Sequence, residues 1–305
     1  MKIRSNGIDI EVEDSATGAD AAHRQRPVVL LIMGLGMQLV AWPEPLVQAL
    51  LDSGYRVVRF DNRDVGLSTP MHALGKPSMF FSMLKFQLGL VPRPPYSLSD
   101  MAQDALGVLD ALGVQRAHVV GVSMGGMIAQ RVAIAAPQRV LSLTSIMSTS
   151  GARHLPKPDP LVLKLLLTRP KSGQGEEGLM QYYLHLFRAI GSPGFATPEH
   201  EMRERILAGV RRSYNPVGVM RQMLAVVSDI TRAAQLERIT SPTLVIHGRA
   251  DPLVPYAGGE DTARRIRGAR MVGIDGMGHD LPPGVVTLLL QHLLPHLQAN
   301  NPSSP

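Results

Sequence analysis

A tight, glycine-flanked turn around one serine constrains this chain more than any other feature of its sequence. Residues 121–125 read Gly-Val-Ser-Met-Gly, directly after the apolar run 117–120 and at the start of a helical pattern, 124–135. A side chain beside the serine would clash in so sharp a turn, so glycine stands two positions before it and two after it. The order of strand, G-x-S-x-G and helix predicts that Ser123 projects its hydroxyl above the end of a sheet, next to a helix N-terminus.

The rest of the chain alternates strand and helix patterns. Continuous apolar runs are typical of strands that are covered on both faces, and alternating residues near the N-terminus predict an early antiparallel strand. The strand candidates are 8–12, 28–33, 55–60, 117–121, 140–146, 243–247 and 270–274, and helix candidates include 43–51, 97–112 and 124–135. The helix at 97–112 opens with a capping box of Ser97 and Asp100. This order predicts an α/β fold with a mostly parallel central sheet flanked by helices.

The alternation stops between residues 151 and 234. This region has no convincing strand pattern, and its helical stretches are divided by glycine and proline. We expect it to be a helical cap inserted into an α/β core of residues 1–150 and 235–299. The apolar segment 79–88 is expected to be a packed surface helix, with a part of an access channel as the alternative. The tail 300–305 is expected to be disordered.

Composition excludes several classes of protein. No apolar run is long enough to cross a bilayer, and the N-terminus carries charges where a signal peptide needs an apolar core, so we expect no membrane span and a cytoplasmic location. The absence of cysteine excludes disulfides, thiolate metal sites and a cysteine nucleophile. The net charge of +6 is spread in short pairs, so we expect no nucleic-acid partner. The sequence leaves open whether the protein is a monomer or a homodimer.

Two residues late in the chain are candidates to activate the serine. A serine hydroxyl is a poor nucleophile at neutral pH and needs a base that is itself oriented by a carboxylate. Asp251 follows the strand 243–247 at the sheet edge where α/β proteins place their sites, although an aspartate before proline also caps turns. His279 stands in a glycine-rich loop after the last predicted strand, with an exposed loop histidine as the alternative. His247, at a strand end, is expected to be structural.

Five segments of the sequence carry a family resemblance. They are 33–36, 60–68, 120–126, 248–252 and 276–279, with further detail at 42–43 and 278–282. Together they resemble the α/β-hydrolase fold family over nearly the whole chain, and most of all the aclacinomycin methylesterase-like serine esterases. The resemblance implies a hydrolase without metal or other cofactor that works through an acyl-enzyme. It assigns Ser123 as nucleophile, His279 as base and then acid, and Asp251 as the orienting carboxylate.

Two positions depart from the family pattern. Met33 stands where many members have a histidine, so a side-chain anchor for the following loop is lost. Asp64 stands where many relatives have glycine. We expect Asp61 and Arg63 to hold this second turn in place rather than to take part in chemistry.

An oxyanion hole needs two backbone N–H groups that point at the developing negative oxygen. We expect them to come from Met124, the residue after the nucleophile, and from Leu35, in the loop after the first buried strand. Methionine is flexible and apolar and suits an adaptable acyl pocket. The candidate pocket residues are Gly34, Gly36, Met37 and Met277 around the site, and Tyr182, Tyr183, Phe187 and Tyr214 in the expected cap.

The expected activity is hydrolysis of small-molecule carboxylic esters of small to medium acyl length. A serine at position 123 of the tight turn argues against the dehalogenases and epoxide hydrolases of the family, which have an aspartate at this position. The same three residues leave lactonases, perhydrolases and carbon–carbon bond hydrolases open. A ligand-binding member of the fold that lacks turnover is a further alternative.

Overall fold

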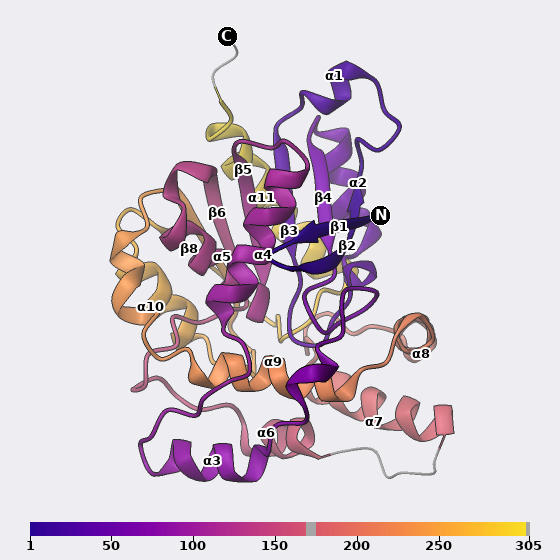
Figure 1. Ribbon diagram of the computed structural model, residues 1–305, viewed down its shortest axis with the longest axis vertical. Coiled ribbons are helices and arrows are strands. Elements are labelled where there is room, and N and C mark those ends of the chain that lie inside the picture. The colour runs from indigo at the N-terminus through magenta and orange to yellow at the C-terminus, as the bar shows by residue number, and fades with distance from the viewer. Residues whose placement is uncertain (169–174, 303–305) are drawn as a thin grey trace.

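One eight-stranded sheet forms the centre of the molecule (Figure 1). The computed structural model describes residues 1–168 and 175–302, without the side chains of Met83, Phe86 and Gln87. The strands pair in the order β1-β2-β4-β3-β5-β6-β7-β8; the first two pairings are antiparallel and all others are parallel. The strands are β1 (Lys2–Ser5), β2 (Ile8–Asp14), β3 (Val28–Ile32), β4 (Arg56–Phe60), β5 (Ala117–Val122), β6 (Val140–Ile146), β7 (Thr243–Gly248) and β8 (Arg270–Ile274). The expected α/β fold with a mostly parallel sheet is confirmed.

Helices cover both faces of the sheet. Successive strand residues point to opposite faces, so Leu30 packs in one apolar cluster with helices α4 and α5, and its neighbour Leu31 packs in another with α2 and α11. The capping box of Ser97 and Asp100 begins α4, as expected. The helices of the core and its loops are α1 (Ala21–Arg24), α2 (Glu44–Asp52), α3 (Met79–Gln87), α4 (Leu98–Ala111), α5 (Met124–Ala135), α10 (Ala257–Arg265) and α11 (Pro283–Ala299). Short 3-10 turns are η1 (Leu39–Ala41), η2 (His72–Leu74), η3 (Pro137–Arg139) and η4 (Ala233–Arg238).

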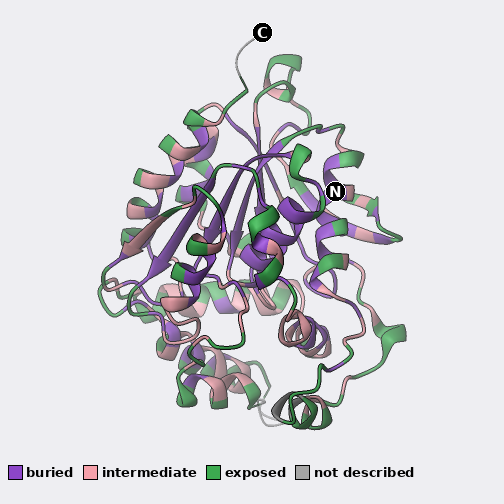
Figure 2. Cartoon of the chain, turned by 90° about the vertical axis from the view of Figure 1, so that its left-hand side faces the viewer, coloured by how far each residue is buried: buried purple, intermediate pink, exposed green. Residues whose placement is uncertain are grey.

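Within the described residues, four α-helices are inserted between β6 and β7. They are α6 (Pro160–Leu167), α7 (Gly175–Ile190), α8 (Glu199–Arg212) and α9 (Pro216–Ser228), and we call them the helical insert. Figure 1 shows the insert at the lower end of the molecule, beyond the carboxyl ends of the parallel strands. It has apolar clusters of its own, around Val162 and around Met180. Figure 2 shows that the strands are buried while much of the surface of the outer helices is exposed.

Two expectations about exposed segments are wrong. The interpretation of 79–88 as a packed helix fails for Phe80 and Phe81, which are 73% and 63% exposed. The predicted disorder of 300–305 fails at Asn301, whose side chain hydrogen-bonds His118 and Tyr55 at 2.9 and 3.3 Å. Residues 303–305 lie outside the described residues. Over the part of the chain that the structure describes, no helix is both long enough and apolar enough to cross a membrane.

Candidate active site

The serine turn between β5 and α5 has the geometry that its glycines predict. Ser123 has φ 57° and ψ −121°, a backbone conformation that few side chains adopt and that is typically kept at functional sites. A Cβ added at Gly121 would lie 2.2 Å from the carbonyl oxygen of Gly125, and one added at Gly125 would lie 2.0 Å from that of Ile32. Neither position therefore admits a side chain. The turn leaves Ser123 partly exposed at the N-terminus of α5.

Three segments far apart in the sequence meet at Ser123. The loop after β7 carries Asp251 and the loop after β8 carries His279. His279 Nδ1 lies 2.7 Å from Asp251 Oδ2, and His279 Nε2 lies 2.9 Å from Ser123 Oγ. With the Nδ1 proton donated to the carboxylate, Nε2 has its lone pair toward the serine hydroxyl and accepts its hydrogen bond. The arrangement can therefore pass a proton from the serine to the imidazole.

The Asp251 carboxylate is buried but well supplied with donors. Its Oδ1 accepts hydrogen bonds from the backbone N–H groups of Leu253 and Val254 at 2.9 and 2.8 Å. Burial alone would raise the pKa of Asp251, but His279 and His247 beside it outweigh burial and lower this pKa below its usual range. The carboxylate therefore stays ionised, which suits a group that orients and stabilises a charged imidazole.

The histidine loop is held from the insert as well as from the sheet. The backbone N–H of His279 donates to the carbonyl of Ile190, the last residue of α7, at 2.7 Å. The N–H of Gly278 donates to the hydroxyl of Ser192 at 2.9 Å. His247 donates from Nε2 to the carbonyl of Val254 at 2.7 Å, which supports its expected structural role. These bonds fix both the ring that faces Ser123 and the loop that carries it.

The loop after β3 runs beside Ser123 on the opposite side. A Cβ added at Gly34 would lie 3.2 Å from the Cβ of Ser123, which shows how close the two backbones are. Among the described residues, no acceptor takes up the backbone N–H of Leu35 or that of Met124. Leu35 belongs to the loop beside Ser123 and Met124 is the first residue of α5, and the use of their N–H groups as an oxyanion hole stays a prediction.

Comparisons with known proteins agree with this geometry. The sequence matches the alpha/beta hydrolase fold family over residues 27–175 and the TAP-like protein family over residues 224–285. It is 31% identical to rhodomycin D methylesterase DnrP of Streptomyces peucetius over 293 residues, covering 89% of this chain and 91% of that protein. The chain belongs to the α/β-hydrolase family.

Solved structures of other hydrolases share the fold. The enol-lactonase from Burkholderia xenovorans LB400 superposes with a TM-score of 0.68 at 21% identity, over 98% of this chain and 100% of that one. The meta-cleavage product hydrolase CumD from Pseudomonas fluorescens IP01 superposes with a TM-score of 0.73 at 19% identity, over 99% and 98%. At these identities the likeness shows the fold alone.

In this hydrolase, helix α9 supplies the anchor that the sequence of the β3 loop lacks. Gln222 is fully buried; its Oε1 accepts from the N–H of Gly36 at 2.9 Å and its Nε2 donates to the carbonyl of Arg63 at 2.8 Å. Asn62 donates from Nδ2 to the carbonyl of Met33 at 2.9 Å. Two amide side chains thus hold both ends of the stretch that contains Leu35.

Arg221, next to Gln222 in α9, pairs with Asp64, the second position that departs from the family pattern. Asp64 has φ 69°, as a glycine would, and its carboxylate accepts two hydrogen bonds of 2.7 Å from the guanidinium of Arg221. Tyr96 donates to the same carboxylate at 2.9 Å. Burial alone would raise the pKa of Asp64, but Arg221 and the other donors outweigh it and lower this pKa. Arg221 and Asp64 are both buried, so the pair is a structural joint between α9 and the turn after β4.

Asp61 and Arg63 hold that turn, as expected from the sequence. Asp61 accepts from the backbone N–H of Leu39 at 2.7 Å and from Arg212 of α8 at 2.7 Å. Arg63 makes two hydrogen bonds of 2.6 Å with Asp104. Asp61 thus bonds the loop after β3 and helix α8 of the insert, and Arg63 bonds helix α4 of the core.

The predicted pocket residues are distributed over three environments. Met277 is fully buried in the core cluster that also contains the apolar residues of α11. It does not line an open pocket, which corrects its prediction as a pocket residue. Gly36 and Met37 belong to the β3 loop, where a Cβ on Gly36 would lie 3.0 Å from Val219 of α9. Tyr214 is 42% exposed.

The three aromatic residues of α7 pack with one another inside the insert. The rings of Tyr182 and Tyr183 are 5.1 Å apart, and those of Tyr183 and Phe187 are stacked at 5.9 Å. The Tyr182 hydroxyl donates to the carbonyl of Leu165 at 3.1 Å. Burial raises the pKa of the Tyr183 hydroxyl, so this group stays protonated at every physiological pH. Their role toward a substrate stays a prediction. Among the described residues, no group of three or more His, Asp and Glu side chains is arranged to hold a metal ion.

Proposed function

We propose that the protein is a serine hydrolase that cleaves carboxylic esters of small to medium acyl length through an acyl-enzyme. The observation that carries the proposal is the chain of hydrogen bonds from Asp251 through His279 to Ser123, at 2.7 and 2.9 Å. Nucleophile, base and orienting carboxylate in hydrogen-bond contact are what acyl transfer by a serine requires.

In the first half of the reaction, Ser123 Oγ attacks the ester carbonyl while His279 Nε2 accepts its proton. The N–H groups of Leu35 and Met124 bind the oxyanion that forms. The intermediate collapses, the alcohol leaves with the proton from His279, and the acyl group stays on Ser123. In the second half, His279 Nε2 takes a proton from water while the water oxygen attacks the acyl carbonyl. The intermediate collapses, the bond to Ser123 Oγ breaks, His279 returns its proton to that oxygen, and the carboxylic acid is released.

The proposed substrate class follows the relatives. Rhodomycin D methylesterase is named for cleavage of a methyl ester, so methyl esters of carboxylic acids are the first class to test. We propose that the helical insert acts as a cap of residues 151–234 over a core of 1–150 and 235–299. Its contacts to Gly36, His279 and Asp61 support this role. A cytoplasmic location and a monomeric or homodimeric state stay predictions.

A serine-directed organophosphonate tests the nucleophile directly. Wild-type protein and Ser123→Ala are exposed to the reagent, and intact-mass spectrometry follows. We expect one adduct on the wild type and none on the variant. If both proteins are folded and neither reacts, or both react equally, the proposal fails. A panel of methyl esters, longer acyl esters, lactones and diketones then identifies the bond that is cleaved.

A further inference from the structure

Helix α3 and the turn after it present apolar side chains to solvent. Phe80 and Leu84 lie on one face of α3, and Leu88, in the turn after it, continues their spacing of four residues; the three are 73%, 43% and 68% exposed. Phe81, Leu90 and Val91 extend this exposure, and we call the six residues the α3 surface. Contiguous exposed apolar patches on a water-facing protein mark sites of interaction.

The same segment carries only positive charge. Between Asp64 and Asp100 the sequence has no aspartate or glutamate, but it has Lys76, Lys85 and Arg93. Within the described residues, none of these three cations forms an ion pair. Apolar and basic side chains thus share one surface without neutralising partners.

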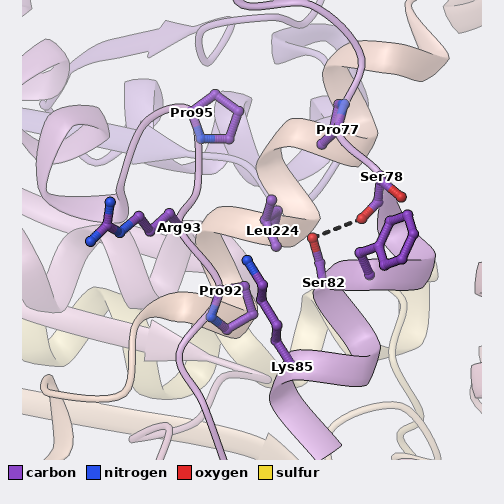
Figure 3. A pocket seen from close by; sticks show the side chains of 9 residues that line it. Pro77, Ser78, Ser82, Lys85, Pro92, Arg93, Pro95 and Leu224 are labelled. Atoms are coloured by element: carbon purple, nitrogen blue, oxygen red, sulfur yellow. Dashed lines mark hydrogen bonds between the residues drawn. The ribbon is translucent and has the colours of Figure 1, made fainter.

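A groove behind α3 brings the two chemistries together. It has a volume of about 270 Å³ and is lined by Phe81, Lys85, Arg93 and Leu224 among others. Figure 3 shows Lys85 reaching toward Leu224 of α9, with Arg93 on the other side of Pro92. A ligand that fits this groove and the neighbouring face has an apolar body and an anionic head.

The position of α3 suits a flat partner. Figure 1 shows α3 and α6 at the same lower end of the molecule. At this end α6 also exposes an apolar and a basic side chain, Leu161 at 57% and Lys164. A second copy of the chain is a poor partner, because pairing two α3 surfaces would bring their lysines and arginines together.

We propose that the α3 surface docks this protein on an anionic lipid bilayer. Phe80, Leu84 and Leu88 enter the boundary between headgroups and acyl chains, while Lys85 and Arg93 lie at the level of the lipid phosphates. Interfacial helices bind membranes by this combination of buried apolar area and attraction to anionic lipid. The docking goes beyond the proposed ester hydrolysis, and its measurement needs no turnover.

Vesicle sedimentation of the full chain tests the proposal. Vesicles of phosphatidylglycerol mixed with phosphatidylcholine are compared with phosphatidylcholine alone, at low and high salt. We expect binding to the anionic vesicles that weakens as salt rises. Phe80→Ser combined with Leu88→Ser should weaken binding by about tenfold or more, because two large apolar side chains no longer enter the bilayer. Lys85→Gln should weaken it by about fivefold, and Lys2→Gln, an exposed lysine on β1, should leave it unchanged.

Three results would overturn the proposal. They are no binding to anionic vesicles, equal binding of wild type and the Phe80→Ser, Leu88→Ser variant, or a dimer in light scattering that this variant converts to a monomer. Circular dichroism and the organophosphonate adduct on Ser123 check that the variants remain folded. Because binding and adduct formation are separate readouts, failure of the docking is distinguished from failure of the proposed hydrolysis.

Discussion

The two sides of Ser123 are held by different parts of the molecule. On one side, Asp251 and His279 stand on loops that directly follow β7 and β8, and their hydrogen bonds line up along the sheet edge. On the other side, the β3 loop with Leu35 depends on Gln222, which comes from α9 in the insert. The sheet side is placed by the strands that its loops follow and is further held by hydrogen bonds to Ile190 and Ser192 of the insert, whereas the loop side has its hold at Gly36 only from the distant α9.

The two sides therefore differ in role: one carries the residues proposed for proton transfer, and the other carries a loop that Gln222 positions. On the sheet side, His279 contacts the serine itself and Asp251 contacts His279, so the loss of either should impair proton transfer. A residue such as Gln222 acts only through the loop that it positions, so its loss should weaken transition-state binding and leave the nucleophile intact. The following experiments, from the largest expected effect to the smallest, test whether the two sides can be separated.

Ser123→Ala should have the largest effect. Without the hydroxyl, turnover of any ester should fall by about 10⁵-fold or more, as it does when a serine nucleophile is removed from comparable enzymes. The exchange is small and the side chain is partly exposed, so the melting temperature should stay close to that of the wild type. Steady-state kinetics and calorimetry check both statements. Residual activity within tenfold of wild type would remove Ser123 from the chemistry.

Arg221→Met should be the most destabilising change on the loop side. It leaves the Asp64 carboxylate buried without its cation, which costs about 3–5 kcal/mol of unfolding free energy. Arg4→Met breaks an exposed pair with Asp9 and should cost less than about 1 kcal/mol. Urea unfolding measures the two, and equal effects would contradict the assignment. Adding Asp64→Gly to Arg221→Met should restore part of the loss, because φ 69° favours glycine.

Gln222→Leu should lower kcat by about 10²-fold with little change in KM. The loop that carries the Leu35 N–H loses its hold at Gly36, and a misplaced oxyanion donor costs about 3 kcal/mol of transition-state stabilisation. Gln48→Leu, an exposed glutamine on α2, is the matched control. The organophosphonate should still label Ser123 in both variants. A rise in KM at unchanged kcat would assign Gln222 to substrate binding instead.

The smallest effect on activity is expected for Asp261, whose ion pairs with Arg264 and Arg265 lie outside both sides of the site. Burial would raise the pKa of Asp261, but Arg265, Ser150 and Arg264 outweigh it and lower this pKa to about 2. A carboxyl with a lowered pKa stabilises the fold above its unfolded value near pH 4, and this contribution is lost as pH falls toward 2. Asp261→Asn should therefore cost about 2 kcal/mol at pH 7 and flatten the acid loss between pH 4 and pH 2. Denaturation at a series of pH values checks it, and kcat should not change.

The contrast between the sheet side and the loop side also explains which site residues can be predicted from the sequence. Most central strands, such as β3 and β7, are continuous or nearly continuous apolar runs, and Ser123, Asp251 and His279 each stand shortly after a predicted strand, so pattern and position point to them. β1 escapes notice because Lys2–Ser5 is a short edge strand with two charges. Helix α10 is missed because its sequence, Ala-Gly-Gly-Glu-Asp-Thr-Ala-Arg-Arg, has no large apolar side chain and two adjacent glycines.

The loop side leaves no such signal. An arginine and a glutamine within a helix normally predict a solvated face, but Arg221 and Gln222 are fully buried. Their partners, Asp64 and Gly36, lie more than 150 positions earlier in the chain, and no local rule relates them. The only hint is negative: Met33 and Asp64 depart from the family pattern, which predicts that something else must hold this loop.

The Arg221–Asp64 pair between α9 and the turn after β4 also limits how the helical insert can be exchanged between related proteins. An insert whose α9 has no arginine at the position of Arg221 would leave the Asp64 carboxylate of this chain buried without its cation. Grafting the insert of this chain elsewhere would strand Arg221 instead. The natural crossover unit is thus discontinuous: segments 33–39 and 61–68 must travel with α9, however short the exchanged helix itself.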